Sequence, residues 1–234
     1  MKKMVIFPVL IILILLSGNS FAQGFHDIGL REGVTWTGVY DYEGVDTEMK
    51  TNLCIGGYLT FHISEKFKIE QELYFTSKGF KTSMDSQVEI DATNYNKINE
   101  STLVSFSYVE MPLLAVFSVT DKIKLKVGGY ADFCISASNE VKTKTETYTL
   151  HEETVDETTV SSWDETAVST DRKYQSLLIG DVNTPGFGLV FGVEYDLGTI
   201  NIGARYSMGL TNVSAKDDME YNHNAIQLLL GFPL

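Results

Sequence analysis

The sequence predicts an all-β protein, an eight-stranded antiparallel up-and-down β-barrel that spans a membrane, and three observations lead to this prediction. Apolar residues alternate with glycine or polar residues over much of the chain, which is the period of a β-strand. The clearest strands run about 11 residues, close to the ~9–11 that a tilted strand needs to cross a bilayer. Very short connections alternate with long polar ones, as they do in outer-membrane barrels.

The hairpin at 185–210 carries the strongest signal. Its two arms, 187–197 and 200–210, place bulky apolar side chains such as Phe191 and Tyr206 on one face. Glycine occupies most of the opposite face, together with Glu194 and Arg205. Apolar residues toward lipid, with small and charged residues toward a narrow lumen, are typical of a membrane barrel.

The same alternation predicts the six remaining strands, at 28–37, 52–63, 67–75, 105–119, 123–135 and 226–234. Three residues depart from the pattern. Glu32 interrupts an apolar face, which is tolerable near a membrane boundary, and Gln71 interrupts another. Pro112 cannot donate a ladder hydrogen bond, so we expect a bulge or a local bend there.

The connections predict how the barrel is oriented. An even number of strands returns both chain ends to the periplasm, which places the turns 63–66, 118–121 and 197–200 on that side. The extracellular side then receives the four long loops, 38–51, 79–104, 136–184 and 211–223. Residues 141–150 still alternate, so strands five and six are expected to extend beyond the membrane.

The N-terminus has the three-part pattern of a secretory signal peptide. Lys2 and Lys3 precede an apolar run over 5–16, and small residues lead to Ala22 before Gln23. We expect cleavage after Ala22, a signal peptide at 1–22, and an outer-membrane β-barrel domain at 23–234. The formal net charge of −13 makes nucleic acid a poor partner.

Four stretches of the chain stand out as motifs: GLREGV (29–34), YVEMPLL (108–114), KLKVGGYADF (124–133) and PGFGLVFGVEYDLGTINIGARYSMGL (185–210). With these motifs the chain resembles the PorT-like outer-membrane β-barrel family of Bacteroidetes-type bacteria. The resemblance implies the barrel fold and a location in the bacterial outer membrane. It also implies a possible role in protein secretion or envelope assembly.

Nine charged residues fall on the inward face by parity: Arg31, Glu70, Glu72, Glu110, Lys124, Lys126, Asp132, Glu194 and Arg205. We interpret them as a paired structural network in the lumen, because a buried charge is costly unless it is matched. The interior of an eight-stranded barrel is just wide enough to be filled by side chains. The alternative interpretation is a path for protons or ions.

Other candidate residues carry weaker signals. His151 and His223 lie in predicted outer loops near many acids, a place where an outer-membrane hydrolase can carry a catalytic base. Solvated loop histidines are the commoner explanation of this pattern, and we prefer it. Cys54 and Cys134 should point inward from strands that are not neighbours, so we expect free thiols. We predict no catalytic residue, no cofactor and no metal site.

The predicted function is that of a non-enzymatic outer-membrane protein with a filled lumen. It would act in envelope structure, surface interaction or secretion and assembly support through the loops 79–104 and 136–184. Its partners would be outer-membrane lipid, the barrel-assembly machinery and an unidentified envelope or secretion protein. Two alternatives remain: a periplasmic lipocalin-like barrel with its apolar face inward, and an outer-membrane hydrolase.

Overall fold

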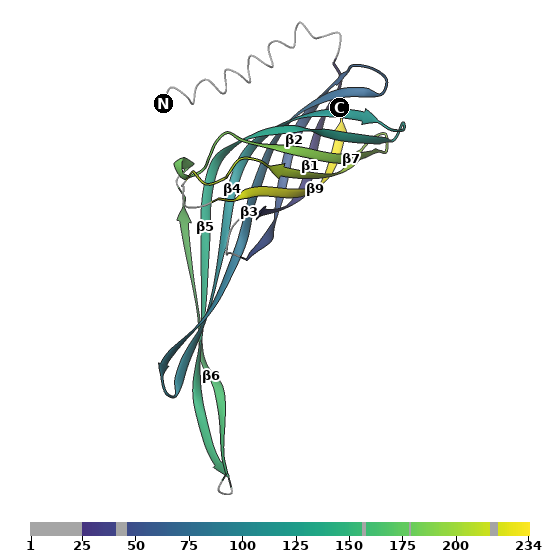
Figure 1. The fold of residues 1–234 in the computed structure, drawn as a ribbon. Coiled ribbons are helices and arrows are strands. Elements are labelled where there is room, and N and C mark those ends of the chain that lie inside the picture. The colour runs from purple at the N-terminus through teal and green to yellow at the C-terminus, as the bar shows by residue number, and fades with distance from the viewer. Residues whose placement is uncertain (1–24, 41–45, 156–157, 178, 216–219) are drawn as a thin grey trace.

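The computed structural model describes residues 25–40, 46–155, 158–177, 179–215 and 220–234 (Figure 1). The predicted signal peptide and its cleavage point lie outside these residues. A short 3-10 helix, η2 (Ile179–Asp181), precedes the seventh strand. The strands are β1 (Phe25–Tyr40), β2 (Thr47–His62), β3 (Phe67–Asp91), β4 (Asn94–Ser118), β5 (Ile123–Val155), β6 (Thr158–Ser176), β7 (Gly186–Asp196), β8 (Asn201–Gly209) and β9 (Asn222–Pro233).

Eight of the nine strands form a closed antiparallel ring. The strand order is β4-β3-β2-β1-β9-β8-β7-β5-β6, and a further pairing of β4 with β5 closes the ring. Among the described residues, β6 pairs only with the outer part of β5 and therefore stands outside the ring. The predicted eight-stranded barrel is confirmed, and closure leaves the ring without unpaired strand edges.

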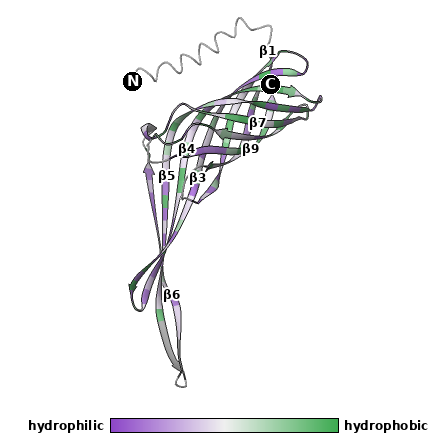
Figure 2. Ribbon diagram, viewed as in Figure 1, coloured by the Kyte–Doolittle hydropathy of each residue, from purple (hydrophilic) through white to green (hydrophobic). Residues whose placement is uncertain are grey.

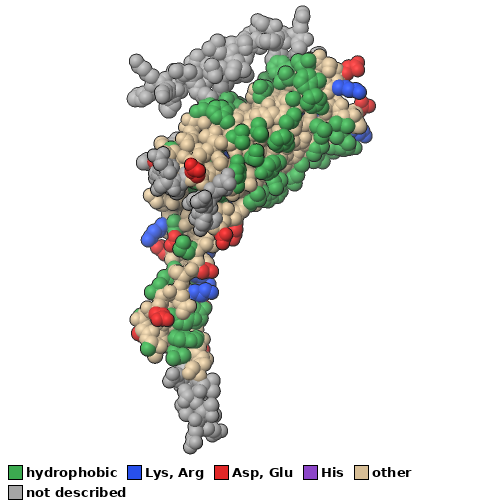
Figure 3. Space-filling view, viewed as in Figure 1, with side chains coloured by type: hydrophobic (Ala, Val, Ile, Leu, Met, Phe, Trp, Pro, Cys, Tyr) green, Lys and Arg blue, Asp and Glu red, His purple; other side chains and the backbone are tan. Residues whose placement is uncertain are grey.

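Side chains of the ring are arranged with apolar residues outside and polar residues inside. Outward residues such as Leu53 and Phe75 are 73% and 58% exposed, whereas Arg31 and Glu72 on the inner face are 2% and 1% exposed. Figure 3 shows apolar side chains gathered over the outside of the barrel. The lipocalin-like alternative requires the reverse arrangement and is wrong. No helix among the described segments is long and apolar enough to cross a membrane.

Three strands continue far beyond the ring. The β3–β4 ladder extends to Asp91 and Asn94, and the β5–β6 ladder extends to Val155 and Thr158. We call residues 83–101, 138–155 and 158–176, which form this four-stranded projection, the arm (Figure 1). The rest of the ring is called the body. The prediction of a long loop at 79–104 is wrong. The predicted extension is confirmed for the fifth strand, β5, which continues through 141–150, but not for the sixth ring strand, β7, which begins at Gly186.

The β1–β2 connection, at the arm end of the ring, is shorter than predicted, and the β7–β8 connection, at the opposite end, is a tight turn. β1 continues to Tyr40 and β2 begins at Thr47, so the first connection is shorter than the predicted loop 38–51. At the far end, the amide of Leu197 donates to the carbonyl of Ile200 across a turn. Gly198 there has a φ of +92°, a conformation that residues with a side chain rarely adopt.

Pro112 and Gln71, which seemed to be two separate irregularities, form one local arrangement. The pairing register of β3 with β4 is the same on both sides of Pro112, so the predicted bulge is absent at that position. The register of β4 with β5 shifts instead between Ser107 and Tyr108, where β5 carries one extra residue, Ile135. The Gln71 side-chain amide donates to the carbonyls of Pro112 and Glu72, each at 2.9 Å. It supplies donors where the ladder is interrupted.

Glu32 does not lie at the edge of the apolar surface. It is exposed on the outer face of β1, between Ile55 on β2 and Leu230 on β9. Apolar residues also occupy the neighbouring outward positions Leu30 and Val34. The expectation of a boundary position is therefore wrong, and a carboxylate stands within the lipid-facing belt.

Candidate functional site: the lumen network and the arm

The nine charged residues predicted to face inward all lie on the lumen side of the ring. Eight of them are buried, and Lys124 at the periplasmic end is partly exposed. Their positions follow from strand parity, because every second side chain of a strand points to the same face. The structure brings seven of the nine into one cluster and the remaining two into another.

Arg31 lies at the centre of the larger cluster. Its guanidinium donates to Glu70 at 2.9 Å, to Glu194 at 2.7 Å, and also to Glu72. These three carboxylates come from β3 and β7, so one side chain on β1 joins strands on different sides of the ring. Planar guanidinium groups suit this role because they carry five donors in a fixed geometry.

The other cations of the larger cluster complete its pairing. Lys126 Nζ lies 2.7 Å from Glu70 and 2.6 Å from Glu194. Arg205 donates to both carboxylate oxygens of Glu72, at 2.7 Å and 2.8 Å. Lys124 lies 2.9 Å from Asp196 and 3.5 Å from Glu194 at the periplasmic end. Each buried carboxylate here has at least two cationic neighbours.

The smaller cluster depends on a residue that the sequence analysis missed. Lys78 is 2% exposed and its Nζ lies 2.6 Å from both Glu110 and Asp132. The predicted network had four cations against five acids, and Lys78 balances them. The missed signal was parity, since Lys78 continues the inward series of Glu70 and Glu72 beyond the predicted end of the strand at residue 75.

Glycine and tyrosine pairs explain why the inner face is rich in glycine. Gly29 lies directly opposite Tyr58, Gly56 opposite Tyr74, and Gly188 opposite Tyr130 on neighbouring strands. A Cβ atom on Gly29 would lie 2.4 Å from the Tyr58 ring, which is closer than side chains can approach. The missing side chain of each glycine therefore makes room for an aromatic ring.

Each of these three rings lies beneath a cation of the network. Arg31 lies 4.2 Å from the centroid of Tyr58, and Arg205 lies 5.5 Å from that of Tyr74. Lys78 lies 4.5 Å from the centroid of Tyr130. Cation–π attraction strengthens when the cation is removed from water. The repeating unit of the lumen is thus a glycine, a tyrosine and a cation rather than a cation and a carboxylate alone.

The extracellular end of the lumen is closed mainly by aromatic and apolar side chains. His223 is buried on β9, and its Nε2 lies 3.4 Å from the hydroxyl of Tyr108. The expectation that His223 is in an outer loop is therefore wrong. His151 lies in β5, where its backbone pairs with Ser162, and not in an irregular loop. Cys54 and Cys134 are buried and free, as predicted.

The open space that remains is small. A pocket of about 20 Å³ beside His223 and Asp132 has room for about one water molecule. A pocket of about 180 Å³ at the periplasmic end is lined by residues that include Lys68, Lys124 and Asp196. No group of three or more His, Cys, Asp or Glu in the described segments is placed to hold a metal ion.

Solved structures of small outer-membrane proteins are similar to this chain. The attachment invasion locus protein Ail of Yersinia pestis has a TM-score of 0.38 at 9% identity, covering 89% of this chain and 98% of that chain. Neisserial surface protein A has a TM-score of 0.43 at 7% identity, covering 88% and 96%. OprG of Pseudomonas aeruginosa has a TM-score of 0.33 at 10% identity, covering 90% and 97%. No curated protein sequence matches the chain.

A family model covers most of the sequence. The model for the outer membrane protein beta-barrel domain matches residues 21–215. This match agrees with the ring of eight strands, its apolar exterior and its charged interior. The chain therefore belongs to the outer membrane protein beta-barrel domain family and is a bacterial outer-membrane β-barrel.

Proposed function

We propose that this protein is a non-enzymatic barrel whose filled body holds the arm outside the cell as a surface for interaction with another protein. The observation that carries the proposal is the ordered sheet formed by 83–101, 138–155 and 158–176, where long loops were expected. A four-stranded sheet that projects from the membrane presents fixed side chains to the surroundings. Loops that position side chains on a rigid scaffold are frequent sites of binding.

The filled lumen supports a structural role for the body. Ten charged side chains, the nine predicted residues and Lys78, form ion pairs inside the ring. We infer that they stabilise and plug the barrel rather than conduct ions. Reconstitution in a planar bilayer should give no stepwise conductance. Regular conductance steps that disappear in a Lys78→Met variant would instead favour the ion-path alternative.

The resemblance to the PorT-like family supports a more specific role, in secretion or envelope assembly, as part of the same proposal. Export would require the signal peptide at 1–22, with cleavage between Ala22 and Gln23. Mass spectrometry of the protein purified from outer membranes should find an N-terminus derived from Gln23. A protein that retains Met1 in the outer membrane would contradict this cleavage.

The arm can be removed while the ring is kept. In the test variant, short turns would replace 84–100 and 140–174, leaving the pairs that close the ring. We expect the variant to fold and to keep the change of electrophoretic mobility that heating causes in intact barrels. In a strain that lacks the native gene, it should fail to restore surface adhesion or protein secretion. Full restoration by the variant would contradict the proposed role of the arm.

A further inference from the structure

Two segments of the chain, 82–96 and 145–171, carry most of the net negative charge of the protein. Residues 82–96 and 145–171 contain no lysine or arginine. They contain eleven acids: Asp85, Glu89, Asp91, Glu146, Glu152, Glu153, Asp156, Glu157, Asp164, Glu165 and Asp171. The formal net charge of the whole chain is −13, so the remainder carries only two net negative charges. A concentrated field of one sign attracts a ligand of the opposite sign.

An aromatic cluster lies on one face of this acidic region. Tyr95 on β4 pairs directly with Tyr148 on β5, and their rings are stacked 4.9 Å apart with an interplanar angle of 8°. Trp163 on β6 lies 4.8 Å from Tyr95 at an angle of 73°. Two rings at nearly a right angle form a corner with aromatic walls. Trp163 remains 46% exposed, so this corner is open to solvent.

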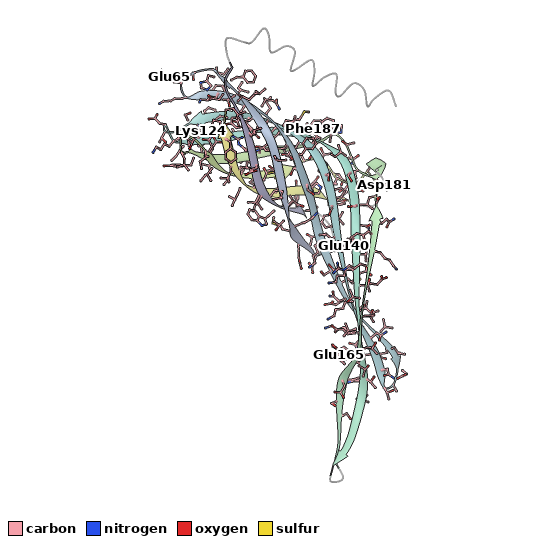
Figure 4. All side chains as sticks on the ribbon, turned by 180° about the vertical axis from the view of Figure 1, so that it is seen from behind. Glu65, Lys124, Glu140, Glu165, Asp181 and Phe187 are labelled. Atoms are coloured by element: carbon pink, nitrogen blue, oxygen red, sulfur yellow. The ribbon has the colours of Figure 1, made fainter. Side chains whose placement is uncertain are left out.

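Carboxylates flank the aromatic pair on both sides. Glu89 on β3 is the cross-strand partner of Tyr95, and Glu165 on β6 is the cross-strand partner of Tyr148. The four residues therefore form one row across all four strands of the arm. In the structure, Glu165 is placed on the arm, far from Lys124 at the periplasmic end (Figure 4).

A pocket of about 270 Å³ lies at this corner. Its lining includes Gln87, Glu89, Asp91, Tyr95 and Trp163, and it contains no basic side chain. The side-chain amide of Asn94 and the Thr93 amide and hydroxyl donate hydrogen bonds to the Asp91 carboxylate and hold its pKa below the usual range. Lys97, two residues along β4 from Tyr95, lies opposite Glu146 in the strand register, and Glu146 forms an ion pair with Lys144.

We propose that this pocket binds the cationic side chain of an arginine or lysine from a polypeptide partner. Aromatic faces attract organic cations through their quadrupole, and carboxylates supply the opposite charge and accept hydrogen bonds. The inference rests on the proposed role of the arm and specifies the chemistry of its ligand. Figure 2 shows that hydrophilic and hydrophobic residues are mixed along the strands of the arm, and Figure 3 shows a mixed surface there, in contrast to the apolar exterior of the body.

The fluorescence of Trp163 provides a direct test with the purified full-length barrel. The chain has two tryptophans, so a Trp36→Phe background leaves Trp163 as the single reporter. The probe is the blocked tripeptide acetyl-Gly-Arg-Gly-amide, and its control is the same peptide with citrulline, which has the shape of arginine without the charge. We expect a saturable change with the arginine peptide and at least tenfold weaker binding of the citrulline peptide.

Matched variants distinguish binding by the pocket residues from attraction by the overall negative charge of the arm. Glu89→Gln and Tyr95→Leu should each weaken binding at least fivefold, whereas Asp171→Asn, the same loss of charge away from the pocket, should change it less than twofold. Heat-modifiable mobility and an unchanged proteolysis pattern would show that each variant is folded. Equal effects of Glu89→Gln and Asp171→Asn, equal binding of citrulline, or no saturable change would each overturn the proposal.

The peptide-binding test and the test of the proposed function can fail separately. Loss of peptide binding in the pocket variants concerns only the ligand chemistry, while the arm-shortened strain tests whether the arm acts at all. A Trp163 response to an uncharged oligosaccharide such as cellotriose, without one to the arginine peptide, would also overturn the proposal. It would then indicate a glycan ligand on the same aromatic corner.

Discussion

The body and the arm share β3, β4 and β5 but are stabilised in different ways. In the body, β3, β4 and β5 lie within a closed ring, with apolar side chains toward lipid and paired charges inside. In the arm, these strands and β6 form an open sheet, in which the described side chains of the edge strands β3 and β6 are exposed and most of those on the central strands β4 and β5 are partly exposed. The backbone ladders between β3, β4 and β5 therefore continue beyond the point where the ring is closed and where the inner side chains are fully buried.

The arm replaces burial with local pairing and residue preference. Its hairpins have close partners along the chain, such as Asp91 with Asn94 at one tip. Residues 141–149 include many threonines, which favour extended backbone because they branch at Cβ. Short loops between paired strands carry a small entropic cost of closure. We therefore expect perturbations in the body to affect global stability much more than perturbations in the arm.

The largest expected effect follows from removing one carboxylate at the centre of the lumen. Glu72→Ala leaves Arg31 and Arg205 with one buried partner fewer, and breaking such buried pairs costs about 3–5 kcal/mol. Urea titration of the barrel folded in lipid vesicles measures this loss. Glu165→Ala in the arm is the matched control and should leave the unfolding free energy unchanged. Equal losses in the two variants would refute the difference between the regions.

A smaller effect is expected where a glycine makes room for a tyrosine. Gly29→Ala places a Cβ atom against the ring of Tyr58, and such overpacking typically costs about 1–3 kcal/mol. The Tyr58→Leu background removes the ring, so the cost of Gly29→Ala should fall there. A double-mutant cycle measured by urea titration determines the coupling. Additive effects would show that the pair does not act as a unit.

The lipid-facing carboxylate of the body should reduce stability by a modest amount. Glu32→Leu replaces a charge within the apolar belt, and removal of an acid at such a position should raise the unfolding free energy by on the order of 1 kcal/mol. The same titration in vesicles measures the gain. A loss of stability would indicate that Glu32 has a favourable interaction in the membrane.

The smallest effect on the body is expected from a proline in β6. Val168→Pro disrupts the ladder with β5, because proline cannot donate a backbone hydrogen bond. Limited proteolysis of intact vesicles should cleave the arm faster, while the heat-modifiable mobility and the urea midpoint of the body stay unchanged. A lower urea midpoint would mean that the arm and the body unfold as one cooperative unit.

Periodicity predicted the body better than the arm for a physical reason. In the body, lipid lies on one side and a narrow lumen on the other, so every strand shows a contrast between its two faces. Around 83–101 both faces meet water, and residues such as Ser83, Asp85 and Ser86 show no such contrast. Lys78 was missed because the predicted strand ended at Phe75, although its parity was correct for the lumen.

The sequence by itself determined the number of ring strands, the face that meets lipid and the inward position of the charges. These properties depend on a period of two, which is local to each strand. Only the tertiary structure decided that Arg31 joins Glu70, Glu72 and Glu194, because these pairs depend on strand register around the closed ring. It also decided that Tyr95, Tyr148 and Trp163 meet, since their contact requires two hairpins to align side by side.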